Sequence, residues 1–145
     1  MLTITDLKKL YDIDDSQWLE ETIILLKNKQ FNQLDLDSLI EELEDLGKEK
    51  RNAVASLLEQ IIRHLLLLEY WTEQQEYNSI HWQGEIYTFR VQLRRKLTTN
   101  LRNYLELELN NIYQDALGFV RIKTQNRAKF PSQCPYFLEQ LCCVA

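Results

Sequence analysis

The chain has 145 residues, of which 45% are hydrophobic and 27% are charged, and its formal net charge is −5. These values are typical of one globular domain with a sizeable core, and they exclude a disordered chain. The longest aliphatic run, residues 65–68, is far shorter than the ~18 apolar residues of a transmembrane helix, so we expect no membrane segment. Three glycines and two prolines leave long segments without helix breakers, which predicts an all-α protein.

The cysteines and the first residues indicate a cytoplasmic protein. The N-terminus lacks the basic-then-apolar order of a signal peptide, and an odd number of cysteines (Cys134, Cys142, Cys143) fits a reduced compartment. A reactive thiol needs a base or a helix dipole to lower its pKa, and nothing near these cysteines in sequence supplies one. We therefore interpret them as small buried residues rather than nucleophiles.

The predicted helices follow in chain order after an N-terminal arm, residues 1–12. Asp14 and Asp35 are N-cap residues for the first and second helices, because their carboxylates can accept hydrogen bonds from free backbone N–H groups. Thr98–Asn100 form a break and a cap before the fourth helix. The main helices are predicted over 14–29, 35–71, 79–97 and 100–123, and a short C-terminal helix over 135–141.

The second helix is the longest, and the rest of the chain is organised around it. Its apolar residues recur at spacings of three and four, which places them on one face that we expect to be the core face. The phase of this face continues across Gly47, so a single helix of about 55 Å is predicted. The residues of this face are Leu36, Ile40, Leu43, Val54, Leu57, Leu58, Ile61, Leu65 and Leu68.

The polar stretch 72–79 is expected to be an exposed loop that leads into the third helix. The overall expectation is a single domain over 1–145, built as a four-helix bundle with mostly antiparallel helices. Residues 1–73 carry 8 Lys and Arg against 16 Asp and Glu, a net −8, and residues 74–145 carry 9 against 6, a net +3. Either the acidic second helix packs beside the basic third helix, or the charge faces a partner.

Several motifs resemble a bacterial family known only as domain of unknown function number twenty-nine. They are LLKNKQFNQLDLDSLIEEL at 25–43, Tyr11-x-x-Asp14-x-x-x-Trp18, the stretch at His64, and Phe130-Pro131 followed by Cys134-Pro135-Tyr136. The resemblance covers nearly the whole chain and implies a small helical protein. It implies no catalytic residues, since the family has none established.

One metal arrangement is compatible with two histidines, namely His81 and Glu85 one helical turn apart with His64 from the neighbouring helix. The competing interpretation is that His64 hydrogen-bonds a nearby carbonyl or carboxylate at the edge of the apolar face. No Glu-x-x-His pair, phosphate loop or nucleophile elbow is present, so we predict no cofactor and no catalytic residues.

Three functional hypotheses follow from these patterns, and an enzyme is the least favoured class. The first is a protein-interaction or regulatory module that self-associates through Leu66, Leu67, Tyr70 and Trp71, since aromatic and apolar residues are enriched at interfaces. The second is a metal- or small-ligand-binding bundle using His64, His81 and Glu85. The third is a nucleic-acid accessory protein that uses a basic surface of Arg90, Arg94, Arg95, Lys96 and Arg102.

Overall fold

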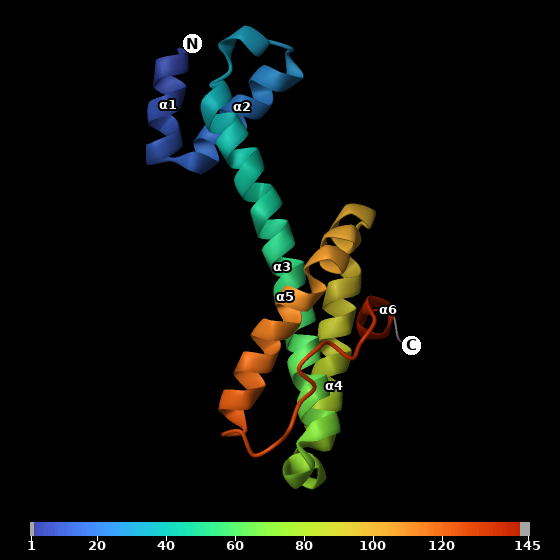
Figure 1. Ribbon diagram of the computed structural model, residues 1–145. Coiled ribbons are helices and arrows are strands. Elements are labelled where there is room, and N and C mark those ends of the chain that lie inside the picture. The colour runs from blue at the N-terminus through green and yellow to red at the C-terminus, as the bar shows by residue number, and fades with distance from the viewer. Residues whose placement is uncertain (1, 143–145) are drawn as a thin grey trace. The chain divides into compact units, whose positions relative to one another are not determined.

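The structure, a computed structural model, describes residues 2–142 and contains no strand within them, as the all-α prediction requires. Its elements are α1 (Ile4–Ile13), α2 (Asp15–Lys27), a 3₁₀ turn η1 (Phe31–Gln33), α3 (Leu36–Tyr70), α4 (Thr72–Lys96), α5 (Thr99–Lys123) and α6 (Leu138–Cys142) (Figure 1). Contacts divide the chain into two compact units, Met1–Glu49 (unit 1) and Lys50–Ala145 (unit 2). No described helix is both long enough and apolar enough to span a bilayer.

Unit 1 contains α1, α2, η1 and the first residues of α3. The predicted arm is a capped helix, because the Thr3 hydroxyl accepts from the Asp6 N–H while the Asp6 carboxylate accepts from the Thr3 N–H. Asp14 and Asp35 cap α2 and α3 as predicted, with their side chains accepting from Gln17 N–H and Ser38 N–H. The buried residues of this unit are Leu7, Trp18, Thr22, Leu34, Asp35 and Ser38.

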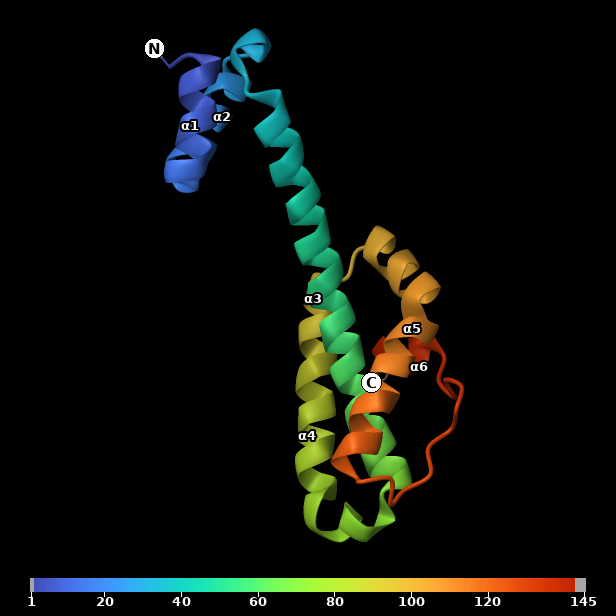
Figure 2. The same ribbon diagram turned by 60° about the vertical axis from the view of Figure 1, so that its left-hand side comes forward.

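Unit 2 contains the rest of α3 with α4, α5 and α6. α4 and α5 both lie beside the C-terminal half of α3, and the segment 124–137 runs back to α6 (Figures 1 and 2). One core joins these elements. Its buried members are Val54, Leu58, Ile61, Ile62, Leu66, Leu67, Trp82, Leu93, Leu105, Ile112, Tyr113, Ala116, Leu117, Val120, Leu138, Leu141 and Cys142.

Two predictions about individual elements were wrong. Residues 72–79 are not a loop, since α4 begins at Thr72 and only Trp71 separates it from α3. Glu and Gln are good helix formers and no breaker occurs there, so their polarity marks an exposed helical turn. The C-terminal helix begins at Leu138 rather than residue 135.

The apolar face of α3 is buried only in unit 2. Val54, Leu58 and Ile61 are fully buried, whereas Leu36, Ile40 and Leu43 are 56%, 53% and 58% exposed. In unit 1 the buried residues at the start of α3 are instead Ser38 and the N-cap residue Asp35. The periodicity predicted the face correctly, but the expectation that all of it lies in the core was wrong.

Candidate functional site

A pocket of about 370 Å³ in unit 2 brings together the two histidines of the chain. It is formed where α3, α4 and α5 meet, and it contains the half-buried His64 and the exposed His81. The other lining residues are Gln60, Arg63, Leu67, Trp71, Asn78, Trp82, Phe119 and Lys123.

His64 is oriented by its own helix. Its Nδ1 lies 2.7 Å from the Gln60 carbonyl oxygen, and because a carbonyl only accepts, Nδ1 carries the proton that is donated. The ring also packs 5.5 Å from the Phe89 ring, centroid to centroid. The hydrogen bond to a nearby carbonyl, one of the two predictions for this residue, is confirmed.

The predicted metal site is not assembled in the part of the chain that the structure describes. No group of three or more His, Cys, Asp or Glu side chains within residues 2–142 is arranged to hold a metal ion. Glu85 lies one turn beyond His81 on α4 and does not line the pocket. The fold therefore places His64 and His81 in the same pocket, as predicted, but the Glu85 carboxylate is not in its wall.

The remaining pocket wall is rich in nitrogen donors. Arg63 pairs with Glu59 one turn earlier on α3, and its guanidinium lies 3.8 Å above the Phe119 ring. Arg63 Nε and Trp71 Nε1 are buried and have no hydrogen-bond acceptor among the described residues. Trp71 stacks on Trp82 with 6.0 Å between ring centroids. Lys123 adds a further cation, and no carboxylate lines the pocket.

The predicted interaction surface on α3 is occupied by the chain itself. Leu66 and Leu67 are 0% and 2% exposed, and Tyr70 packs edge-to-face on Phe130 at 6.1 Å. The helices α4 and α5 and residues 124–137 cover this end of α3 on several sides. The apolar residues on nearly all sides of this end are therefore in contact with the chain itself. The assignment of Leu66 and Leu67 to an external contact was therefore wrong. Tyr70 and Trp71 are half-buried, and their place at a contact stays a prediction.

The predicted basic surface is divided between internal and external roles. Arg90 donates from Nε to the Leu141 carbonyl (3.0 Å) and from Nη2 to the Gln140 carbonyl (2.9 Å), and burial lowers its pKa. Arg102 lies 3.9 Å from the Glu139 carboxylate. Both side chains therefore hold α6, and of the five predicted residues only Arg94, Arg95 and Lys96 are exposed on α4.

The cysteines have no reactive setting in the described residues. Burial raises the pKa of the Cys134 thiol, whose Sγ lies 3.5 Å from the Tyr136 carbonyl, and Cys142 is buried in the core. A raised pKa disfavours the thiolate that a nucleophile requires. Cys143 lies outside the described residues.

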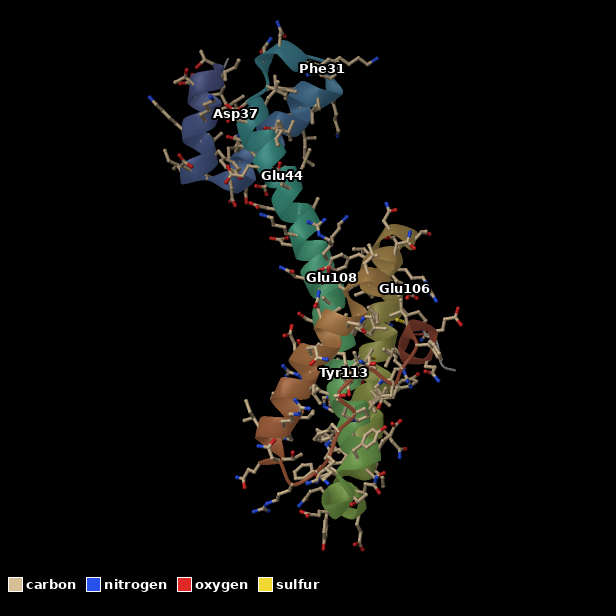
Figure 3. All side chains as sticks on the ribbon, viewed as in Figure 1. Phe31, Asp37, Glu44, Glu106, Glu108 and Tyr113 are labelled. Carbon is tan, nitrogen blue, oxygen red and sulfur yellow. The ribbon has the colours of Figure 1, made fainter. Side chains whose placement is uncertain are left out.

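An exposed apolar stripe in unit 1 was not predicted as a site. Leu36, Ile40 and Leu43 share one face of α3, and their spacing places Asp37 and Glu44 along one edge of that face. Figure 3 shows Asp37 and Glu44 on the N-terminal part of the chain. The sequence contains a signal for this site, because the strongly acidic segment 1–49 also contains the three apolar residues. Periodicity alone assigns such a face to the core, where an apolar helix face usually lies.

A family model described as "Domain of unknown function DUF29" matches residues 10–143. No curated protein matches the chain, and no solved structure matches it.

Proposed function

Because the chain belongs to the DUF29 family, whose description assigns no activity, we propose from its geometry that it is a protein-interaction module. Its apolar stripe on α3 (Leu36, Ile40 and Leu43) binds an amphipathic helix of another protein that has basic residues at its edge. The observation that carries the proposal is the exposure of these three side chains, which is 56%, 53% and 58%.

Hydrophobic burial would provide the affinity. Covering a half-exposed Leu or Ile contributes roughly 1 kcal/mol, and Leu46, which is 46% exposed, widens the stripe. Helices commonly bind in this way, with apolar anchors at intervals of three and four residues. A stripe of several such anchors is therefore suited to a moderate, reversible complex.

Charge would provide the specificity. Residues 1–49 carry 5 Lys and Arg against 13 Asp and Glu, a net −8, whereas residues 50–145 carry 12 against 9, a net +3. Glu44 and Asp37 border the stripe, although Asp37 also forms an exposed ion pair with Lys8 at 3.5 Å. A ligand helix with Lys or Arg at its edge is attracted to this border, and a ligand helix with Glu at its edge is repelled.

The test uses two synthetic amphipathic helices with the same Leu stripe, one edged by Lys and one by Glu. The Lys-edged peptide is expected to bind the full chain in a calorimetric titration, to bind less tightly as salt is added, and not to bind the Ile40→Glu variant. The matched control is Ile122→Glu on α5, where the side chain is 79% exposed and the substitution should leave binding unchanged.

Equal binding of both peptides, or undiminished binding to Ile40→Glu, would contradict the proposal. Thermal unfolding adds a second check, because substitution of an exposed side chain usually changes stability by no more than about 0.5 kcal/mol. A large loss of stability in Ile40→Glu would mean that the chain covers this residue itself, and the proposal would fail.

A second candidate function is binding of a small anion in the pocket of His64 and His81. It is supported by the cationic side chains of Arg63 and Lys123, which line a pocket whose wall contains no carboxylate. Inorganic phosphate and benzoate are suitable probes of the pocket. Protection against thermal unfolding that is lost in His64→Ala would support this function, and equal protection of both proteins would exclude it.

The proposal includes a cytoplasmic location and a bundle of mostly antiparallel main helices. Cys134 is a free thiol, which suits a reducing compartment. The connections from α3 to α4 and from α4 to α5 are Trp71 and Leu97–Thr98, and connections this short favour antiparallel neighbours.

A further inference from the structure

The outer face of α4 carries a second run of exposed apolar residues, and it lies in unit 2. Tyr77, Ile80 and Tyr87 are 81%, 88% and 70% exposed, and their spacing places them on one face of the helix. Val91 continues this face by one further turn and is half-buried. We call these four residues the α4 stripe.

Gly84 lies in the middle of the α4 stripe without an internal reason to be glycine. A Cβ built there would meet no heavy atom within 4 Å, so no neighbour in the chain requires the missing side chain. Glycine within a helix is destabilising relative to alanine, because it loses more conformational freedom on folding. Gly84 lies between large exposed side chains. A glycine at this place would let a helix of another molecule cross α4 at short distance.

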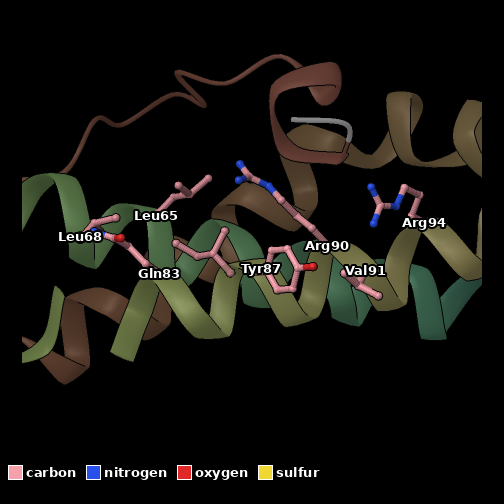
Figure 4. Close-up of a pocket in the computed structure, with 8 residues that line it drawn as sticks. Leu65, Leu68, Gln83, Tyr87, Arg90, Val91 and Arg94 are labelled. Carbon is pink, nitrogen blue, oxygen red and sulfur yellow. The ribbon is translucent and has the colours of Figure 1, made fainter. Parts of the chain in front are cut away.

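A pocket of about 330 Å³ opens beside the same stripe (Figure 4). Tyr87 and Val91 of the stripe line it, Leu65 and Leu68 come from α3, and Arg94 lies toward one end. The α4 face therefore carries both a protruding apolar residue, Ile80, and a partly apolar hollow one to two turns further along. A surface with both features can fit a second copy of itself.

The charges on α4 show the same self-complementarity. Glu73 and Glu76 precede the stripe, Arg94 and Arg95 follow it, and none of these four exposed side chains forms an ion pair within residues 2–142. Gly84 is the midpoint between Glu73 and Arg95, and also between Tyr77 and Val91. Two antiparallel copies crossing at Gly84 would therefore place opposite charges together at both ends.

We propose that a second copy of this chain binds the α4 stripe, with the two α4 helices antiparallel across a twofold axis at Gly84. Ile80 and Tyr77 of each copy enter the hollow beside Tyr87 and Val91 of the other. Glu73 of each copy pairs with Arg95 of the other. This surface is separate from the α3 stripe of the proposed function, so Ile40→Glu leaves the dimer intact and the two proposals are tested independently.

The experiment measures the solution mass of the full chain by light scattering over a range of concentrations. The wild type is expected at twice the mass of one chain, and Ile80→Glu at the mass of one chain with helical circular dichroism retained. Leu107→Glu on α5 is the matched control, since that side chain is 83% exposed and the variant should stay dimeric.

A charge exchange makes the test specific to the antiparallel register. Glu73→Arg alone and Arg95→Glu alone should each weaken the dimer about tenfold, because each change acts twice in a twofold interface. The double variant restores opposite charges and should return the dissociation constant close to that of the wild type. A monomeric wild type, a dimeric Ile80→Glu, or a double variant as weak as the single ones would each overturn the proposal.

Discussion

Arg90 shows how a charged side chain becomes part of the fold. Its guanidinium donates to the carbonyls of Gln140 and Leu141, which lie in the short helix α6. The last carbonyls of a helix have no partner within it, and planar guanidinium N–H groups can satisfy two of them together. The residue therefore stabilises the C-terminal segment on α4 rather than offering charge to an external ligand.

Replacing Arg90 with Met should lower the free energy of unfolding by about 1–2 kcal/mol, since two charge-assisted hydrogen bonds are lost, one partly buried to Leu141 and one exposed to Gln140. Chemical denaturation followed by circular dichroism measures the change. Lys96→Met on the same helix is the matched control, where the exposed side chain should contribute less than about 0.5 kcal/mol. Equal effects of the two substitutions would exclude this role for Arg90.

The helix ends show which local signals the sequence contains. Asp14 and Asp35 were predicted as caps, and residues 98–100 were predicted as a break and a cap. In the structure Asp14, Asp35 and Thr98 each accept a hydrogen bond from the N–H three residues later. Capping is a local interaction, so nearby sequence is sufficient to predict it. The start of α4 was missed because Trp71 gives no capping signal, and its side chain makes no capping hydrogen bond.

Thr98→Ala should lower the free energy of unfolding by about 1 kcal/mol, because the hydroxyl that accepts from the Leu101 N–H at 3.2 Å is removed from the start of α5. Thermal unfolding of Thr98→Ser provides the control, since serine keeps an acceptor at this position and should retain most of the stability. A serine variant as unstable as the alanine variant would show that packing of the threonine methyl, not capping, is the cause.

At the scale of the whole molecule, alkaline pH is expected to destabilise the core of unit 2. Burial raises the pKa of Tyr113 to about 12, and burial also raises the pKa of Tyr136 and of Cys134. An unfolded tyrosine has a pKa of about 10, so the folded chain holds the Tyr113 proton more tightly. The resulting stability is complete below about pH 10 and is lost as the pH rises toward about 12.

Melting temperatures measured across this alkaline range test the expectation. The wild type should lose stability steeply as the pH rises, and Tyr113→Phe should lose it less steeply, even though its starting stability is lower without the hydrogen bond from Tyr113 to the Pro131 carbonyl. Identical slopes in wild type and Tyr113→Phe would assign alkaline unfolding to other groups.

The sequence by itself determined the helical class, most helix boundaries, the caps and the phase of the apolar face of α3. These features depend on neighbours three or four residues away, which the printed chain supplies directly. The resemblance to the family also followed from motifs in the sequence, and the match over residues 10–143 confirmed it.

Only the tertiary structure decided which apolar faces are covered. Leu67 and Ile40 lie on apolar parts of the same helix, yet the first is 2% exposed and the second 53%, because different elements lie against α3 in the two units. The tertiary structure also decided which residues line the pocket, since His64 and His81 line it and Glu85 does not. Periodicity fixes the face of a helix to which a residue belongs, whereas burial depends on contacts between residues far apart in sequence.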